Sequence, residues 1–440
     1  MPRRTSLDRS SVPGPSFHEA LGAWGRIALL SFGGPAAQIA VMHRIIVEEK
    51  GWIDEKRFLN ALNFCMLLPG PEAQQLATYL GWLTHGVRGG LVAGLLFILP
   101  GFLSILLLSF IYVWFGSAPA VEGLLFGLKA AVLAVVLVAL NQLRRRVLHG
   151  RLRVFIAAAA FAALFFLHLP FPLVILGAAL LGLWEARGAR APEPGAGAAR
   201  QDTRPIPTAL VGLAAWLGPL LLLAAVLGPG HLLSQVGLFF SQVALVSFGG
   251  AYAVLAYVAQ HAVEAQGWLT PVEMVDGLGL AETTPGPLIQ VLQFVAFLAA
   301  WRDATPFDPA VAALLASIVA TWATFAPCFV WIFLGAPWVE RLVVKPRLNG
   351  ALRGVGAAVV GAVLNLSLWF ALHILFAEVG ERQFGPVRLL LPEPASVNEL
   401  SVLIAALALA LLAWRRWGLL PVLGLAAGAG MLLSLLGLHT

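Results

Sequence analysis

Long runs of apolar residues dominate the chain, separated by short segments that carry charges, proline or glycine. Residues 91–115 and 354–376 are two such runs, and each is long enough to cross a hydrocarbon core about 30 Å thick. The runs are uniformly apolar instead of alternating, which indicates helices and not a β-barrel. The pattern therefore predicts an all-α integral membrane protein with about thirteen transmembrane segments.

The polar breaks between the runs predict how the chain is organised. Residues 1–18 form a polar cytoplasmic tail, 19–185 a first transporter repeat and 208–230 a linking transmembrane helix, followed by a second repeat over 231–440. Residues 186–207 are rich in Ala, Gly, Pro and Arg without an apolar period, which is typical of a flexible linker.

The distribution of basic residues predicts a cytoplasmic N-terminus. This orientation places most arginines inside, among them the cluster from Arg144 to Arg153 and also Arg353. The segment 43–58, HRIIVEEKGWIDEKRF, argues against it, because its basic residues would then lie outside.

One phrase occurs twice in nearly the same form, as ALLSFGGP at 28–35 and ALVSFGGA at 244–251, 216 residues apart. At this fixed offset Glu48 matches Glu264, and the Gly-Trp and Pro-Gly-Pro landmarks match as well. Such landmarks do not recur by chance in an Ala- and Leu-rich chain, so they indicate duplication. Seven predicted segments precede the second copy, so the two halves are expected to be inverted repeats, an architecture common among secondary transporters.

Both repeated motifs are predicted to break a helix near the middle of the membrane. Gly-Gly-Pro and Pro-Gly-Pro remove N–H donors and allow non-helical dihedral angles, and the helix that resumes points its free N–H groups into the gap. A helix N-terminus is a natural site for an oxyanion. Glycine and proline also serve close helix packing in membranes, and this structural interpretation stays open. The substrate-binding candidates are Ser31, Gly33, Gly34, Asn63, Pro69, Gly70, Pro71, Gln74, Gln75, Ser247, Gly249, Gly250, Thr283, Thr284, Pro285, Gly286, Pro287 and Gln290.

Charged residues inside apolar segments are costly and so are functional candidates. Glu72 follows the first Pro-Gly-Pro and Glu282 precedes the second, and both are candidates for proton coupling. Arg26 and Lys129 are candidate partners for an anion. The alternatives are that the two carboxylates cap helix breaks or face water, and that Arg26 extends to the membrane surface.

Composition narrows the classes of function. Apolar residues make up 60% of the chain and charged residues only 11%, and the formal charge of +6 is explained by topology, so no nucleic-acid partner is expected. Cys65 and Cys328 lie in apolar runs without ligand spacing, so neither a metal, a disulfide nor a cofactor is expected. No enzyme motif occurs, which leaves an ion gradient or the substrate's own gradient as the energy source.

The SFGGP motif, a following Gly-Trp, LLPGPEAQQLATYLGW and GLLFILPGF resemble the long-chain, two-domain members of the chromate transporter family. The resemblance covers both halves and implies an antiporter in the bacterial inner membrane that exports chromate, driven by the proton motive force, with sulfate as a competitor. The second half has Ala251 after SFGG and Pro-Cys-Phe at 327–329 where the first has Pro-Gly-Phe at 100–102. These differences leave open whether both halves form one shared site.

Two further hypotheses remain open at this stage. The substrate could be sulfate or another anion, because helix N-termini select charge and size more than element. The chain could instead be a passive anion channel or a membrane scaffold. The oligomeric state is open as well, a homodimer included.

Overall fold

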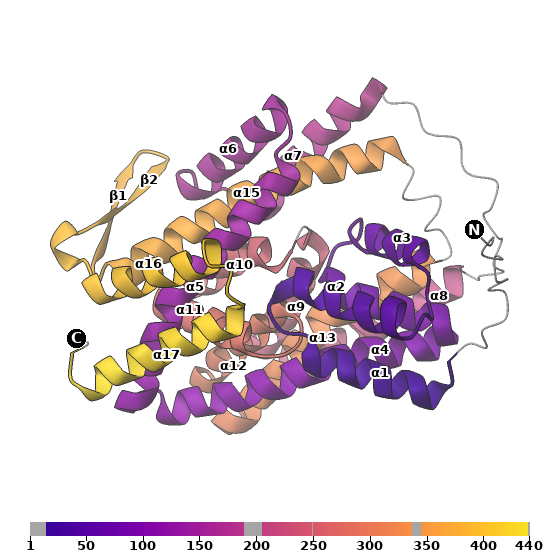
Figure 1. Ribbon diagram of the computed structural model, residues 1–440, viewed down its shortest axis with the longest axis horizontal. Helices are drawn as coiled ribbons and strands as arrows, with labels where there is room; N and C mark the ends of the chain where they lie inside the picture. The colour runs from indigo at the N-terminus through magenta and orange to yellow at the C-terminus, as the bar shows by residue number, and fades with distance from the viewer. Residues whose placement is uncertain (1–14, 189–204, 249, 337–344, 439–440) are drawn as a thin grey trace, which may run out of the picture.

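The computed structural model describes residues 15–188, 205–248, 250–336 and 345–438, and helices make up nearly all of it (Figure 1). The first half contains α1 (Phe17–Leu30), α2 (Gly34–His43), the π-helix η1 (Arg44–Glu49), α3 (Glu55–Cys65), α4 (Glu72–Phe115), α5 (Pro119–Val147), α6 (Arg151–Phe165), α7 (Phe171–Glu185) and the 3-10 helix η2 (Ala186–Gly188). Helix α8 (Pro205–Leu227) follows, where the sequence predicts a linking helix.

The second half follows a similar order. It contains α9 (Leu232–Val246), α10 (Ala251–Ala259), the π-helix η3 (Gln260–Ala265), α11 (Pro271–Thr283), the 3-10 helix η4 (Leu288–Gln290), α12 (Val291–Arg302), α13 (Pro309–Gly335), α15 (Pro346–Leu375), β1 (Val379–Phe384), β2 (Val387–Pro392), the 3-10 helix η6 (Pro394–Ser396), α16 (Glu399–Ala413) and α17 (Leu419–Leu435). Elements η4, α12 and α13 lie at the positions that correspond to α4, and a β-hairpin is added before the last two helices. The β1–β2 hairpin projects from one side of the molecule (Figure 1).

The hairpin corrects the prediction of an all-α fold. Strands β1 and β2 pair antiparallel, with Val379 opposite Pro392 and Phe384 opposite Val387. Gly385, at φ +59°, begins the two-residue turn between them, and glycine at this position suits a tight hairpin. The polar composition of this segment hides the strands, because both lie outside the apolar runs.

The described helices fit a multi-pass membrane protein. Six are long and apolar enough to cross a membrane, and four shorter apolar helices accompany them. Large apolar side chains cover the outside of the molecule, such as Val226, which is 72% exposed. Lipid chains are the surroundings that such a surface requires.

The SFGG and Pro-Gly-Pro motifs interrupt helices, as the sequence predicts. Helix α1 ends at Leu30 and α2 begins at Gly34, while α9 ends at Val246 and α10 begins at Ala251. The loops that contain residues 69–71 and 285–287 likewise separate α3 from α4 and α11 from η4.

The two halves have the same local structure at the offset of 216 residues. The π-helices η1 and η3 begin and end at matching positions. Gly51 and Gly267 follow them at φ +61° and +62°. Ser31 and Ser247 end their helices at φ −84°, ψ 72° and φ −81°, ψ 76°. Equal dihedral angles at equivalent positions support the duplication that the sequence indicates.

Each half packs one long helix, α5 or α15, against the last apolar helix of the other half. A Cβ atom at Gly127 of α5 would lie 1.9 Å from the carbonyl oxygen of Ala426 in α17. Its counterpart 227 residues later, Gly354 of α15, would place a Cβ atom 2.2 Å from the carbonyl oxygen of Ala178 in α7. Small residues allow such close approach in membranes. Exchanged, equivalent contacts of this kind are what two-fold symmetry produces.

The buried apolar residues form two clusters. One contains residues of α1, α2, η1, α3 and the beginning of α4, together with Ile332 of α13 and Ala336, which follows that helix. The larger one contains the remaining helices of the core. Helix α4 belongs to both, and it is bent at His85 and Gly86, where the backbone leaves helical geometry.

Candidate functional site

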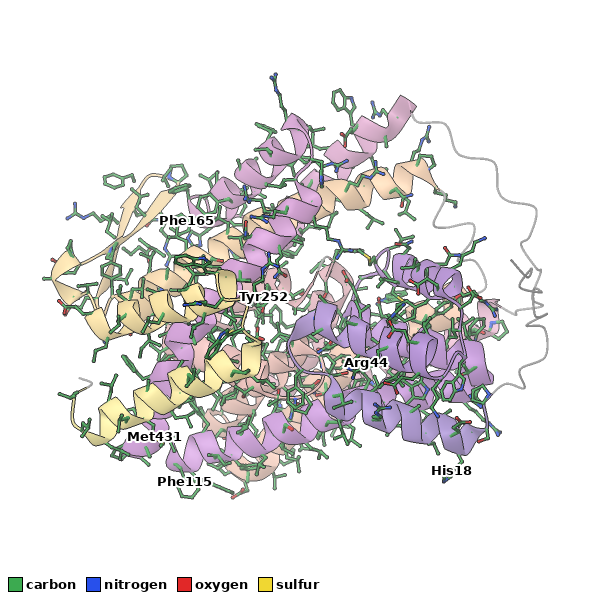
Figure 2. The ribbon with its side chains drawn as sticks, viewed as in Figure 1. His18, Arg44, Phe115, Phe165, Tyr252 and Met431 are labelled. Atoms are coloured by element: carbon green, nitrogen blue, oxygen red, sulfur yellow. The ribbon has the colours of Figure 1, made fainter. Side chains whose placement is uncertain are left out.

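A large cavity lies where elements of the two clusters meet. Its volume is about 880 Å³. Residues of α2, the α3–α4 loop, α5, α10, α11 and α15 line it, so both halves contribute to the wall. Tyr252, one of the lining residues, lies near the middle of the molecule in Figure 2, whereas Phe115 and Met431 lie near its margin.

Both SFGG breaks open onto this cavity. Gly33 and Gly34 of the first break line it, at φ +83° and +82°, and helix α2 starts there. Gly250 of the second break lines it at φ +110°, and α10 starts at the next residue. Gly249 lies outside the described residues. Positive φ angles favour glycine, so the glycines at these positions are what allow the helices to break there. The N-terminal ends of two equivalent helices therefore reach the same cavity.

The serines of these motifs lie behind the cavity wall and join the two halves. The backbone N–H of Gly70 donates to the carbonyl oxygen of Ser247 at 2.6 Å, and the N–H of Gly286 donates to that of Ser31 at 2.8 Å. Each Pro-Gly-Pro loop thus bonds to the SFGG break of the other half. The Gln38 side chain, which the sequence analysis missed, adds a bond to the Gly286 carbonyl at 2.6 Å.

The Pro-Gly-Pro loops are too tightly packed to accept larger residues. A Cβ atom at Gly70 would lie 2.7 Å from the sulfur of Cys328, and one at Gly286 would lie 3.1 Å from the Cα atom of Gly101. These glycines have φ of +126° and +101°. Cys328 and Gly101 thus occupy matching places against the loop of the opposite half. The cavity lining includes none of Pro69, Gly70, Pro71, Pro285, Gly286 and Pro287.

Of the predicted uncharged polar residues, one lines the cavity and the others form hydrogen bonds within the protein. Asn63 lines the cavity. The others bond within the protein: Gln74 to Thr78 at 3.0 Å, Gln75 to the Pro69 carbonyl at 2.7 Å, Gln290 to Gln293 at 2.9 Å, and Thr283 and Thr284 to carbonyl oxygens of α11 at 2.8 and 3.0 Å. These bonds shape the breaks and leave Asn63 as the predicted amide on the wall.

Both predicted carboxylates line the cavity. Glu72 begins α4, and Glu282 lies at the end of α11, where its side chain is 2% exposed. The hydroxyl group of Tyr252 donates a hydrogen bond to Glu282. Tyr252 also lines the cavity. Sequence reasoning missed it because the search for polar candidates in apolar segments looked for charged residues, and tyrosine is uncharged.

The two predicted cations lie elsewhere and have carboxylate partners. Arg26 is half exposed and pairs with Glu49 at 2.5 Å. Lys129 lies 3.4 Å from Asp276, which also accepts a hydrogen bond of 2.9 Å from Tyr112. Neither cation is among the cavity-lining residues. Asp276 is 4% exposed, and it escaped notice because the predicted segment began beside it, near Val275.

Three arginines that the sequence analysis assigned to topology do line the cavity. They are Arg146 at the end of α5, Arg153 at the start of α6 and Arg353 in α15. Their positions at helix ends offered a signal, but the rule for cytoplasmic basic residues explained them equally well.

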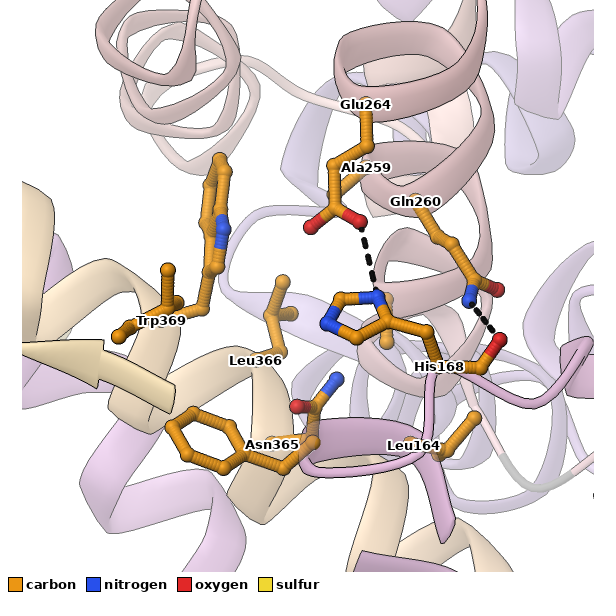
Figure 3. A pocket seen from close by; sticks show the side chains of 11 residues that line it. Leu164, His168, Ala259, Gln260, Glu264, Asn365, Leu366 and Trp369 are labelled. Atoms are coloured by element: carbon orange, nitrogen blue, oxygen red, sulfur yellow. Dashed lines mark hydrogen bonds and ion pairs between the residues drawn. The ribbon is translucent and has the colours of Figure 1, made fainter. Parts of the chain in front are cut away.

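A second, small pocket lies beside the β-hairpin (Figure 3). It holds about 20 Å³, room for about one water molecule. His168 and Glu264 lie 3.2 Å apart there, and Arg388 of β2 lies 3.4 Å from the same carboxylate. These contacts fasten the hairpin to the helices, and the pocket is too small for a solute.

Among the described residues there is no cluster of three or more His, Cys, Asp or Glu that could hold a metal ion. Cys65 and Cys328 are both free and buried.

Comparison with known proteins gives one consistent result. The family model described as "Chromate transporter" matches residues 19–183 and 234–432. The chain is 31% identical over 340 residues to the chromate transport protein of Cupriavidus metallidurans, covering 77% of this chain and 78% of that protein. It is 30% identical over 430 residues to the chromate transport protein of Pseudomonas aeruginosa, covering 94% and 95% of the two chains. No solved structure matches.

Proposed function

Since the chain belongs to the chromate transporter family, we propose that it is a secondary transporter that exports chromate from the bacterial cytoplasm across the inner membrane in exchange for protons. The observation that carries the proposal is the cavity, because equivalent helix N-termini from both halves reach it. The names of the relatives, chromate transport protein in both cases, supply the substrate class.

The substrate site that we propose lies between the N-termini of α2 and α10. Gly33 precedes α2, which begins at Gly34, and Gly250 precedes α10, so free N–H groups of the first helical turns and two helix dipoles are available to an anion. Chromate is a tetrahedral dianion whose oxygens accept such bonds. Binding through N–H groups, without a fixed cation beside them, also favours release on the other side of the membrane.

Glu72 and Glu282 are the residues that we propose for proton coupling. Both line the same cavity as the N-termini of α2 and α10. Glu282 is buried and accepts a hydrogen bond from Tyr252. Intramembrane carboxylates mark proton pathways in many transporters. A proton that binds Glu282 removes a negative charge from the cavity, which couples the proton to the anion through their shared space.

Alternating access requires a closure on the side of the protein away from Arg146, and the contacts of Asp276 with Lys129 and Tyr112 are placed to provide it. Lys129 of α5 lies about 25 Å along its helix from Arg146, which lines the cavity. Asp276 and Glu282 lie on the same helix, α11, so closure and proton site can move together.

We further propose that the halves are inverted copies with a cytoplasmic N-terminus. The exchanged contacts of α5 with α17 and of α15 with α7 support a two-fold axis that relates the halves. Because an odd number of predicted segments precedes the second copy, this axis is expected to lie in the plane of the membrane. Reporter proteins fused after Glu49 and after Gln266 should lie on opposite sides of the membrane. Reporters on the same side would exclude the inversion.

Chromate uptake by inside-out vesicles tests the function, with empty vesicles as background and with an uncoupler or excess sulfate added. We expect uptake that the uncoupler abolishes and that Glu282→Gln reduces at least tenfold. The matched control is Glu122→Gln, an exposed carboxylate of α5 away from the cavity. Uptake that persists with the uncoupler would indicate a passive channel, and strong competition by sulfate with weak chromate uptake would reassign the substrate.

A further inference from the structure

Three arginines stand at the exposed end of the cavity. Arg146, Arg153 and Arg353 all line it, from α5, α6 and α15. Arg146 and Arg353 are exposed, whereas Glu282 and Val359 in the same wall are buried. The arginines therefore mark the mouth of the cavity, and the carboxylate lies at its inner end.

The helix ends that carry the three arginines meet around Val147. Arg153 donates from Nη1 to the Val147 carbonyl oxygen at 3.5 Å. A Cγ atom of Val147 lies 3.4 Å from the position of a Cβ atom on Gly356, one helical turn after Arg353. Arg146 directly precedes Val147 in the chain. Residues from both halves thus bring three positive charges to the wall of one cavity.

These arginines have no carboxylate within 4.0 Å among the described residues. Other arginines of the described chain do, as Arg302 has in Glu273. The Nε group of Arg153 is also buried without a hydrogen-bond partner. Like charges that are gathered without counter-charges repel one another, and an anion among them removes that cost.

Arg146 extends from this cluster toward the first helix break. Its Nη2 lies 3.1 Å from the sulfur of Met66. Met66 and Glu72 flank the first Pro-Gly-Pro loop, and both line the cavity. An anion that leaves the mouth along Arg146 would therefore arrive beside the broken helices.

We infer that Arg146, Arg153 and Arg353 form a separate binding site for a tetrahedral dianion at the cavity mouth, and that Arg146 passes the dianion inward. The inference rests on the proposed function. Guanidinium groups present two parallel N–H donors that match two oxygens of such an ion. Because attraction grows with the charge of the ligand, the site selects dianions over chloride or nitrate and raises the rate of capture.

Topology offers a competing explanation, since basic residues gather on the cytoplasmic side in any case. That explanation treats Arg144, Arg145 and Arg146 alike, because they are consecutive residues in the last turn of α5. The structure distinguishes them: Arg146 lines the cavity, and Arg144 and Arg145 do not. These neighbours are therefore matched controls that change the same charge at the same helix end.

The test uses the full-length protein with single substitutions Arg146→Gln, Arg153→Gln, Arg353→Gln, Arg144→Gln and Arg145→Gln. Chromate binding to the purified protein is measured by equilibrium dialysis, and uptake by inside-out vesicles is measured over a range of ionic strength. We expect the three cavity variants to raise KM and Kd about tenfold or more, with kcat changed less than about twofold. Their kcat/KM should depend less on ionic strength than that of the unmodified protein, a readout that a purely structural role would not move.

The controls Arg144→Gln and Arg145→Gln should bind and transport like the unmodified protein. Arg146→Lys keeps the charge but loses the forked donor, so its Kd and KM should lie between those of the unmodified protein and those of Arg146→Gln. This variant also tests the site if Arg146→Gln does not fold. If the unmodified protein binds chromate and the cavity variants match the controls, the mouth site is excluded. If the unmodified protein binds neither chromate nor sulfate, the proposed function fails and takes this inference with it.

Discussion

Replacing Gly127 or Gly354 with alanine tests the packing that joins the two halves. A methyl group at Gly127 would lie 1.9 Å from the Ala426 carbonyl oxygen, and one at Gly354 would lie 2.2 Å from the Ala178 carbonyl oxygen. Ordinary van der Waals contact begins at 3.4 Å. Helix α5 must therefore move away from α17, or α15 from α7, by roughly 1 Å or more, because a backbone oxygen cannot turn aside.

The expected loss of stability follows from two opposing effects. Overpacking in a well-packed interior costs about 1–3 kcal/mol. Alanine is the better helix former, which returns up to about 1 kcal/mol. We therefore expect each substitution to lower the free energy of unfolding by about 1–2 kcal/mol. The two sites share no helix, so the double variant should lose about the sum.

Thermal unfolding of the purified protein in detergent, followed by tryptophan fluorescence, measures this difference. The control is Gly428→Ala in α17, where an added methyl group meets nothing within 4 Å; it should be as stable as the unmodified protein or slightly more stable. Adding Ala426→Gly to Gly127→Ala should not restore stability, because the clash involves the backbone oxygen of residue 426. Equal unfolding temperatures for Gly127→Ala and Gly428→Ala would refute the described packing of α5 on α17.

Four further substitutions test the site. Glu282→Gln should abolish uncoupler-sensitive uptake while chromate binding, measured by dialysis, is kept; loss of both would place Glu282 in the substrate site instead. Tyr252→Phe removes the hydroxyl donor to Glu282 and should alter the dependence of uptake on pH, and superimposable pH profiles would contradict the role of this bond. Asp276→Asn leaves Lys129 without its partner and should lower stability by about 2 kcal/mol in thermal unfolding, and adding Lys129→Met should recover part of the loss; no recovery would mean that the pair is not coupled. Gly286→Ala, strained at φ +101° and only 3.1 Å from a backbone atom, should abolish uptake and lower stability by about 2 kcal/mol or more; normal uptake would show that the loop is not fixed.

The sequence predicts the helix breaks because they depend on local chemistry. Glycine at positive φ and proline without an N–H group act within one or two residues of their own position, as at Gly33 and Gly250. The bonds that hold the breaks in place are different. Gly70 and Ser247 are distant in the chain, and no pattern of single residues indicates that one donates to the other. The duplication shows which motifs are equivalent, but not that each motif bonds to the opposite half.

Charge was harder to interpret from sequence than backbone chemistry. A cation inside an apolar run is noticed at once, yet Lys129 has a structural partner in Asp276, and Arg26 pairs at the surface with Glu49. Arg146, one of three arginines that do line the cavity, lies in a cluster that topology already explains. The rule that basic residues gather on the cytoplasmic side accounts for Arg144, Arg145 and Arg146 alike. Only the structure shows that Arg146 lines the cavity and that its two neighbours do not.

Equivalent positions of the two halves carry different side chains on the two sides of the cavity. Tyr252 and Glu282 of the second half correspond, at the offset of 216 residues, to Ala36 and Met66 of the first, and all four line the cavity. Both halves keep the helix break, although Pro35 of the first half lacks the N–H group that its counterpart Ala251 has. The hydrogen-bonded carboxylate occurs on one side only. Under the proposed function, backbone groups of both halves would hold the anion, and the carboxylate bonded to Tyr252 would bind a proton on the wall of the second half, so substrate and proton would have distinct places in one cavity.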